Sequence, residues 1–344
     1  MTEATFAPGE PLSPREGVER YLAHREGYVA DATLESYDYA LRPFLDWCEE
    51  HHVEALDELT GRHFDAYETA QRQQVAKTTV KNRMKDLRTA VRYWEQIEEV
   101  PEDLSEKVPV RNLPKSEEVR DETLFWSEAQ PLLAWYSRAG HAGSKHHALL
   151  ELAWNTAARV GALRALDLRD YYPEKGVLWF RHRPGMDTPL KNGEDGERVV
   201  SISPRVVAAL DTYIEEHRNG VRDDYGRSPL FTSQQGRPAV STFRVWFYKL
   251  TRPCVFGSCP HNREPETCEA TEHQAESKCP SSHSPHPVRK GSISWHLANR
   301  VPISVVEARC DASREVIRRH YDMRSPVDRA LDRRETVLPR IDYS

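Results

Sequence analysis

The sequence predicts a mainly α-helical protein of two domains, with one small antiparallel sheet in the second. In the N-terminal part, apolar residues recur at spacings of three and four, as on a helix that buries one face. A polar segment punctuated by proline follows, and beyond it a helical series is interrupted by a hairpin at residues 177–202. The 344 residues are enough for two ordinary domains, each with its own core.

The first domain is expected to span residues 14–104 and to be all helical. Residues 33–48 predict one helix with an inward apolar face, and a second helix is expected to open at Leu59. A third opens at Thr79, and its apolar residues are Val80, Met84, Leu87, Val91 and Trp94. Residues 1–13 are expected to be disordered, because they are polar and rich in proline.

The third of these helices is strongly basic. Between Lys77 and Arg92 there are six cations and a single acid, Asp86, although the whole chain has a formal net charge of −6. Such a run suits a DNA backbone, because Lys and Arg neutralise phosphates; a solvated helix face is the alternative. The residues expected to contact DNA are Lys77, Lys81, Arg83, Lys85 and Arg88.

A linker is expected at residues 105–121, where prolines and charged residues replace the apolar pattern. The second domain is expected at 122–335, and residues 336–344 form a short tail. The polar turn of its hairpin contains Lys191.

Five residues spread over the second domain suit phosphodiester chemistry without a metal ion. Arg159 and Arg289 offer guanidinium donors for the non-bridging oxygens, on which negative charge spreads when the phosphorus is attacked. A tyrosine, with an ordinary pKa of about 10, becomes a nucleophile when cations favour the phenolate and a base takes its proton. Tyr321 and His286 fit these two roles. Lys191 is placed to protonate the leaving 5′-oxygen.

In this order, the five residues resemble the signature of the tyrosine recombinase (phage-type integrase) family. The run from Thr156 to Leu168 is similar to the family's first Arg box, and His286-x-x-Arg289 is similar to the second. The resemblance covers most of the chain, from about residue 14 to 330. It implies a helical, SAM-like core-binding domain and an α-rich catalytic domain with a small antiparallel sheet, which together encircle a duplex.

The resemblance implies a site-specific DNA recombinase, or integrase. Tyr321 would attack a DNA phosphate to form a 3′-phosphotyrosyl link, and the freed 5′-hydroxyl would attack the partner strand. Because the bond energy is retained, no cofactor is expected for catalysis. The implied partners are double-stranded DNA and further copies of the chain, assembled as a tetramer on the DNA. From its position, the segment 325–344 is expected to dock on a neighbouring protomer.

Two positions depart from the family pattern. Residues 310–313 stand where a Gly-His or Gly-Trp pair is usual, so a third phosphate donor is missing. An ionised Asp311 does not donate, so either His296 or His320 replaces that donor, or the site works with one fewer. Ala162 stands where an acidic residue often follows the first Arg. Neither change removes the nucleophile or the two guanidiniums.

Two other classes of protein stay open at this point. A non-catalytic DNA-binding protein derived from an integrase would keep the basic helix without needing Tyr321, and the missing donor favours it. A type IB topoisomerase-like enzyme uses a similar residue set, although the helical N-terminal block and the modest length favour a recombinase.

An insert at residues 254–283 carries four of the six cysteines, Cys254, Cys259, Cys268 and Cys279. Disulfides are not expected in a cytosolic chain. A structural zinc ion bound by these thiolates would fold a loop too polar for its own core. The spacings of 4, 8 and 10 intervening residues are not those of paired knuckles, so reduced thiols are the alternative. A metal here would position the second Arg box.

The sequence also bears on the membrane question. No apolar run approaches the roughly 18 residues of a membrane span, and the first residues lack the basic segment of a signal peptide. A cytoplasmic protein without a membrane partner is therefore expected.

Overall fold

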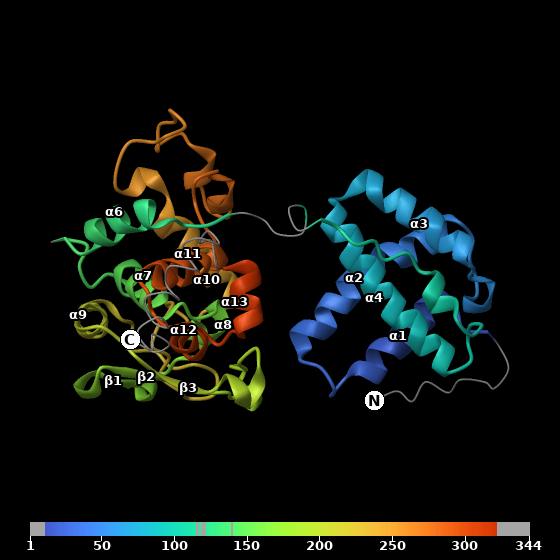
Figure 1. Cartoon of the computed structure of the whole chain (residues 1–344), viewed down its shortest axis with the longest axis horizontal. Coiled ribbons are helices and arrows are strands. Elements are labelled where there is room, and N and C mark those ends of the chain that lie inside the picture. Colours follow the sequence, from blue (N-terminus) through green and yellow to red (C-terminus); the bar gives the residue numbers. More distant parts are fainter. Residues whose placement is uncertain (1–10, 115–116, 118–121, 139, 322–344) are drawn as a thin grey trace, which may run out of the picture. The chain divides into compact units, whose positions relative to one another are not determined.

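The computed structural model describes residues 11–114, 117, 122–138 and 140–321. The chain divides into two compact units, Met1–Asp121 and Glu122–Ser344. Both consist mainly of α-helices, and the second also contains a three-stranded antiparallel sheet (Figure 1). The expected fold class, mainly α with a small antiparallel sheet, is confirmed.

The described part of the first unit has four α-helices: α1 (Pro14–Arg25), α2 (Asp31–Glu50), α3 (Gly61–Gln74) and α4 (Lys77–Gln96). α1 packs against α2 and α4, and α3 packs against α4. α1 begins at a capping box, in which the side chains of Ser13 and Glu16 each accept a backbone N–H of the other residue. Trp94 is fully buried in this unit, and its indole N–H donates to Gly17 O at 2.8 Å.

The predicted inward face of α4 is confirmed, because all five of its apolar residues are buried. The core of the first unit also includes Leu12, Leu104 and Val108. Leu104 is the first residue of a 3₁₀ turn, η2 (Leu104–Lys107), which lies against α4, and Val108 follows this turn. The stretch expected as a linker therefore begins as part of this unit, and Leu12 packs just before α1. Residues 1–10 lie outside the described part of the chain.

The second unit has eight described helices, and the bounds of each are as follows: α6 (Trp126–Tyr136), α7 (Lys145–Thr156), α8 (Val160–Ala165), α9 (Pro204–Thr212), α10 (Val240–Thr251), α11 (Pro285–Ala298), α12 (Ile303–Cys310) and α13 (Arg314–His320). α7 is the central helix, and nine of its 12 residues are buried. It packs against α6, α9, α10 and α11. Its burial follows from this central place, since several of its faces meet another element.

The sheet has the order β1 (Tyr171–Tyr172), β2 (Val177–Phe180), β3 (Arg198–Ser201). β2 and β3 pair antiparallel, with Val177 opposite Ser201 and Phe180 opposite Arg198. The predicted hairpin is thereby confirmed. Leu178, Phe180 and Val200 are buried while Trp179 and Val199 are exposed, so one face of the hairpin covers the core.

α11 lies very close to the chain that enters the second unit. A Cβ atom on Gly291 would stand 1.8 Å from Leu124 O, so only glycine allows this approach. Leu124 N also donates to Pro287 O at 3.2 Å. Together these contacts fix the first turns of α11, which carry the second predicted Arg box.

A buried ion network supports the segment that follows α8. Asp167 and Asp170 are 1% and 0% exposed. Arg183 donates to Asp170 at 2.5 Å, and Arg237 forms ion pairs with Asp167 and with Asp223. Leu230 N donates to Leu166 O at 2.8 Å beside this network. Buried charges persist only when they are paired, so the network fixes how the chain leaves the first Arg box.

The insert at 254–283 forms a looped extension of the second unit, orange in Figure 1. Its regular structure is limited to three one-turn 3₁₀ helices: η8 (Pro253–Val255), η9 (Glu269–Thr271) and η10 (Glu276–Lys278). η9 and η10 contact each other, and η10 contacts α10.

Replacing Asp167 by alanine is expected to lower the free energy of unfolding of the second unit by about 3–5 kcal/mol, because it removes one of the two carboxylates that pair with the buried guanidinium of Arg237. The matched control is Asp38→Ala on α2, which breaks an exposed i,i+4 pair with Arg42 and should cost less than about 1 kcal/mol. Urea unfolding followed by circular dichroism, with proteolysis to assign each transition to its unit, measures both. Equal small losses would show that the network does not stabilise the fold.

Candidate active site

The five residues predicted to be catalytic line a single pocket of about 570 Å³. Arg159 is the N-cap residue of α8, and Lys191 lies between β2 and β3. His286 and Arg289 are in the first turns of α11, and Tyr321 is the C-cap residue of α13. Four segments that are distant in the sequence thus contribute to one cavity.

Arg289 is buried and firmly held. The residue is 3% exposed. Its Nη1 donates to Ala157 O at 2.5 Å and to Cys310 O at 2.6 Å. Ala157 caps the C-terminal end of α7, and Cys310 is the last residue of α12. Carbonyls at helix C-termini lack intrahelical partners, and the helix dipole favours a cation there. Arg289 therefore joins the ends of two helices to α11.

Two further donors of Arg289 have no partner. Nε and Nη2 are buried, and neither donates to any acceptor in the part of the chain that the structure describes. An unpaired buried donor is costly unless a ligand or water satisfies it. Since Arg289 lines the pocket, a phosphate oxygen entering there would meet the kind of fork that binds it best.

Arg159 has a different environment. Its side chain is 25% exposed. Burial lowers the pKa of Arg159, the nearby Arg289 lowers it further, and Asp311 opposes both effects. Arginine nonetheless stays protonated at neutral pH. Two guanidiniums at one pocket repel each other, so an anion between them is strongly favoured.

Asp311 supplies such an anion within the protein. Its carboxylate accepts from Arg159 Nη1 at 2.5 Å and from Asn192 Nδ2 at 2.7 Å. The sequence predicted only that this residue could not donate a hydrogen bond, and it missed the ion pair because 152 positions separate the two partners. Asp311 has a left-handed backbone, with φ of 54°, where it ends α12. That turn directs its carboxylate toward Arg159.

Tyr321 and His286 are neighbours in the pocket. Their ring centroids are 5.9 Å apart, and the Tyr321 ring lies 5.7 Å from the Arg289 guanidinium carbon. Tyr321 is 6% exposed, and its carbonyl accepts from Ser294 Oγ at 2.5 Å. The Tyr321 ring therefore lies beside a cation and an imidazole.

Lys191 is exposed on the connection between β2 and β3 and lines the same pocket. The next residue, Asn192, is tied to Asp311. Asp311 therefore contacts both the lysine-bearing turn and the first arginine. Asn192 was not singled out from the sequence, because turn asparagines are usually explained by local backbone geometry.

The structure provides no replacement for the third donor at His296. This residue does not line the pocket, and its Nδ1 donates to Ser292 O at 2.7 Å. Burial lowers the pKa of His296, which favours its neutral form. The side chain of His320 lies outside the described residues, as does the segment 325–344 that was expected to dock on a neighbour.

The basic residues of α4 have unequal roles. Lys77 and Lys85 are exposed, and Lys77 forms an ion pair with Glu117 at 3.0 Å. Lys81 is half-buried. Arg83 donates to Gln71 and Arg88 donates to Val108 O, and both side chains are partly buried. The two arginines therefore stabilise the first unit, a role that charge counting could not distinguish from DNA contact.

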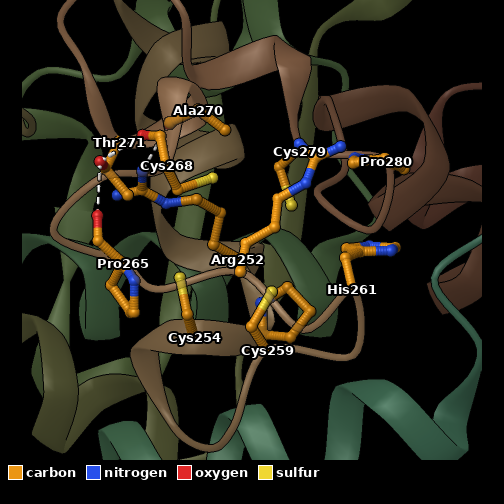
Figure 2. Close-up of a pocket in the computed structure, with 12 residues that line it drawn as sticks. Arg252, Cys254, Cys259, His261, Pro265, Cys268, Ala270, Thr271, Cys279 and Pro280 are labelled. Carbon is orange, nitrogen blue, oxygen red and sulfur yellow. Dashed lines mark hydrogen bonds between the residues drawn. The ribbon is translucent and has the colours of Figure 1, made fainter.

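The four cysteines of the insert line another pocket, together with His261 (Figure 2). All four are free thiols of intermediate exposure. Burial raises the pKa of Cys254, although the adjacent Arg252 lowers it. Within the described ranges, no three His, Cys, Asp or Glu side chains are close enough together to hold one metal ion.

The described helices include none that is both long and apolar enough to cross a membrane. No protein-family model matches the chain.

Three known proteins are similar to the chain. A protein of Caldanaerobacter subterraneus subsp. tengcongensis, provisionally named a tyrosine recombinase, is 24% identical over 205 residues; these are 60% of this chain and 64% of the relative. The integrase of transposon Tn1549, solved in complex with a circular intermediate DNA, has a TM-score of 0.66 at 15% identity, covering 95% of this chain and all of that one. The lambda integrase dimer bound to a core site has a TM-score of 0.63 at 13% identity, covering 91% and 78%.

These likenesses agree with the site. The two solved structures share the fold over more than nine-tenths of this chain, and the curated relative shares part of its sequence. The residues that carried the resemblance in the sequence occupy one pocket in the fold. The chain has the fold of these integrases, and its motifs resemble those of the tyrosine recombinase (phage-type integrase) family.

Proposed function

We propose that the protein is a site-specific DNA recombinase that cuts and rejoins DNA through a 3′-phosphotyrosyl intermediate on Tyr321. The observation that carries this proposal is the gathering of Arg159, Lys191, His286, Arg289 and Tyr321 around one pocket. Each of these residues alone is common in a structural role. A shared cavity is what a reaction at a single phosphate requires.

The two guanidiniums bind the scissile phosphate in this proposal. Arg289 is already fixed through Nη1, so Nε and Nη2 are held ready to donate to non-bridging oxygens. Arg159 contributes from the opposite segment after it exchanges Asp311 for the phosphate. Donors that are already in place need little reorganisation when negative charge develops in the transition state.

The chemical step is a transesterification. Tyr321 Oη forms a bond to phosphorus as the bond from phosphorus to the 5′-oxygen breaks. The phenolic proton passes to His286, and Lys191 gives a proton to the leaving 5′-oxygen. In the second half of the reaction a 5′-hydroxyl of the partner strand attacks the phosphotyrosine and releases Tyr321. Since one phosphoester replaces another, the reaction needs no ATP and no catalytic metal.

DNA is also the ligand suggested by the likeness to integrases solved with DNA. On this proposal, Lys77, Lys81 and Lys85 of α4 contact the phosphate backbone, while Arg83 and Arg88 act mainly within the first unit. Exchange of strands between two duplexes involves four cuts, so a tetramer of protomers on the DNA is part of the proposal. A non-catalytic descendant of an integrase is less favoured, because all five predicted catalytic residues line one pocket.

The covalent intermediate provides the direct test. Incubation with nicked duplexes taken from the DNA that flanks the gene should give a covalent protein–DNA band on a denaturing gel. Tyr321→Phe should abolish that band and still shift the duplex on a native gel, because only the nucleophilic oxygen is lost. Tyr225→Phe, at a tyrosine that is 51% exposed and outside the pocket, is the matched control and should behave as wild type. If neither wild type nor control forms the band while both bind the duplex, the proposed cleavage is wrong.

Asp311→Asn should strengthen binding of the cleavage site and raise the rate of covalent-complex formation, each by roughly tenfold, equivalent to about 1.4 kcal/mol. The carboxylate competes with the phosphate for Arg159, and the amide keeps its size without its charge. Single-turnover cleavage and filter binding at one salt concentration measure the two effects. Asp195→Asn removes an exposed carboxylate from the same connection and controls for net charge. Slower cleavage by the Asp311 variant would mean that the carboxylate assists the reaction.

Charge on α4 is tested by Lys81→Ala and Lys85→Ala. Each should weaken binding to all duplexes alike and reduce the slope of log affinity against log salt by about 1, since each removes one phosphate contact. Lys107→Ala, an exposed lysine outside α4, should leave the slope unchanged. Binding isotherms at several salt concentrations provide the measurement. An unchanged slope in both α4 variants would remove this helix from the interface.

A further inference from the structure

The insert between α10 and α11 has almost no hydrophobic core. Its buried apolar residues are two alanines, Ala270 and Ala275. The other buried residues within it are polar, Glu276 and Ser282. One-turn 3₁₀ helices and turns make up its backbone. A segment of this length gains too little from apolar burial to hold one conformation, so another kind of bond is needed.

The insert is nevertheless closed at its base. Thr251 Oγ1 accepts from His283 N at 2.7 Å and donates to His283 O at 3.2 Å. Nearby, Lys249 forms an ion pair with the buried Glu276 at 3.1 Å. These contacts hold the two ends of the insert together and leave the middle of the loop to be fixed by its own residues.

The chain between Thr251 and His283 carries all four cysteines. Cys254, Cys259, Cys268 and Cys279 come from separate turns and line one pocket (Figure 2). In the close-up they surround Arg252, whose Nη1 donates to Ala270 O at 2.6 Å. Four thiols around one small pocket, beside a cation, are an unusual arrangement for side chains that serve only to fill space.

We propose that these four cysteines bind one zinc ion as a tetrathiolate. Zinc prefers four ligands in a tetrahedron, and thiolates from turns of a small polar loop are characteristic of its structural sites. Binding requires the sulfur atoms to approach to about 2.3 Å from a common point, which they do not do in this structure. Rotation of the cysteine side chains and tightening of the turns would bring this about, with Arg252 left beside the site to offset its negative charge. Four protons are released as the four thiols become ligands.

The position of the insert gives the metal a consequence for the active site. The last cysteine is followed after a few residues by His283, which is bonded to α10, and then by Pro285, the first residue of α11. A rigid insert would therefore fix the direction in which α11 starts and the orientation of His286. This consequence rests on the proposed function, whereas the metal site itself does not.

The metal is measured on the full-length protein without reference to DNA cleavage. Protein purified under reducing conditions with added zinc, then desalted, should contain one zinc per chain by mass spectrometry of the metal. Replacement of zinc by Co²⁺ should give visible d–d bands and thiolate charge-transfer bands, which are typical of tetrahedral sulfur coordination. Absence of both signals in the wild-type protein would overturn the proposal.

Variants locate the ligands. Cys268→Ser should lose the zinc and the thiolate bands, and Cys48→Ser, which alters a buried thiol of the first unit, should keep both. His261→Ala tests the ligand set, because this imidazole lines the pocket but is bonded to Ser281 at 3.0 Å. The His261 variant is expected to retain zinc. If it loses zinc, the ligand set includes the His261 imidazole and is not four thiolates.

Thiol counting separates the remaining explanation. If four cysteines of the native protein fail to react with a thiol reagent under non-reducing conditions and no metal is bound, the insert is held by two disulfides and the proposal is wrong. If the zinc is present but Tyr321 forms no covalent complex, the metal site stands and the proposed recombinase activity fails. The two proposals are therefore separable by experiment.

Discussion

The candidate active site depends on the hydrogen bonds that the guanidinium of Arg289 donates to two helix ends. A single nitrogen, Nη1, binds the terminal carbonyls of α7 and α12. The residue after Ala157 leads directly to Arg159, and the residue after Cys310 is Asp311. By joining the two helix ends, Arg289 sets where the first arginine and its carboxylate partner emerge. Its Nε and Nη2 have no acceptor among the described residues and can therefore donate to a ligand.

α11 is held on several sides so that this arginine is precisely placed. Gly291 permits close contact with Leu124, and Ser292 Oγ donates to Trp154 O at 2.5 Å. Farther along, Ser294 Oγ holds the carbonyl of Tyr321. One helix thus carries His286 and Arg289 and also fixes the backbone of the proposed nucleophile. The placement of His286, Arg289 and the Tyr321 backbone is therefore set by the packing of a helix, which favours pre-organisation.

The electrostatics of the pocket are balanced by the protein when DNA is absent. Asp311 lies where the sequence lacks the usual third donor, and it pairs with Arg159. A carboxylate, like a phosphate, is negatively charged and accepts hydrogen bonds from guanidinium groups. It therefore relieves the repulsion between the two arginines. On the proposed function, the phosphate must displace it. The excess of acidic residues in the whole chain is compatible with a locally cationic site, because Arg159 and Arg289 both line this pocket.

The sequence by itself determined the fold class, the buried face of α4, the hairpin and the five residues of the pocket. Periodicity fixes which face of a helix is buried, and the order of chemically distinctive residues is a property of the sequence alone. Only the tertiary structure decided that Arg83 and Arg88 serve the first unit, that His296 is remote from the pocket, and that Asp311 pairs with Arg159. Each of these depends on a contact between distant segments or on the burial of a polar group. Charge and spacing along the chain carry no information on which partner a long side chain will meet, because that is set by the packing of the helices that carry it.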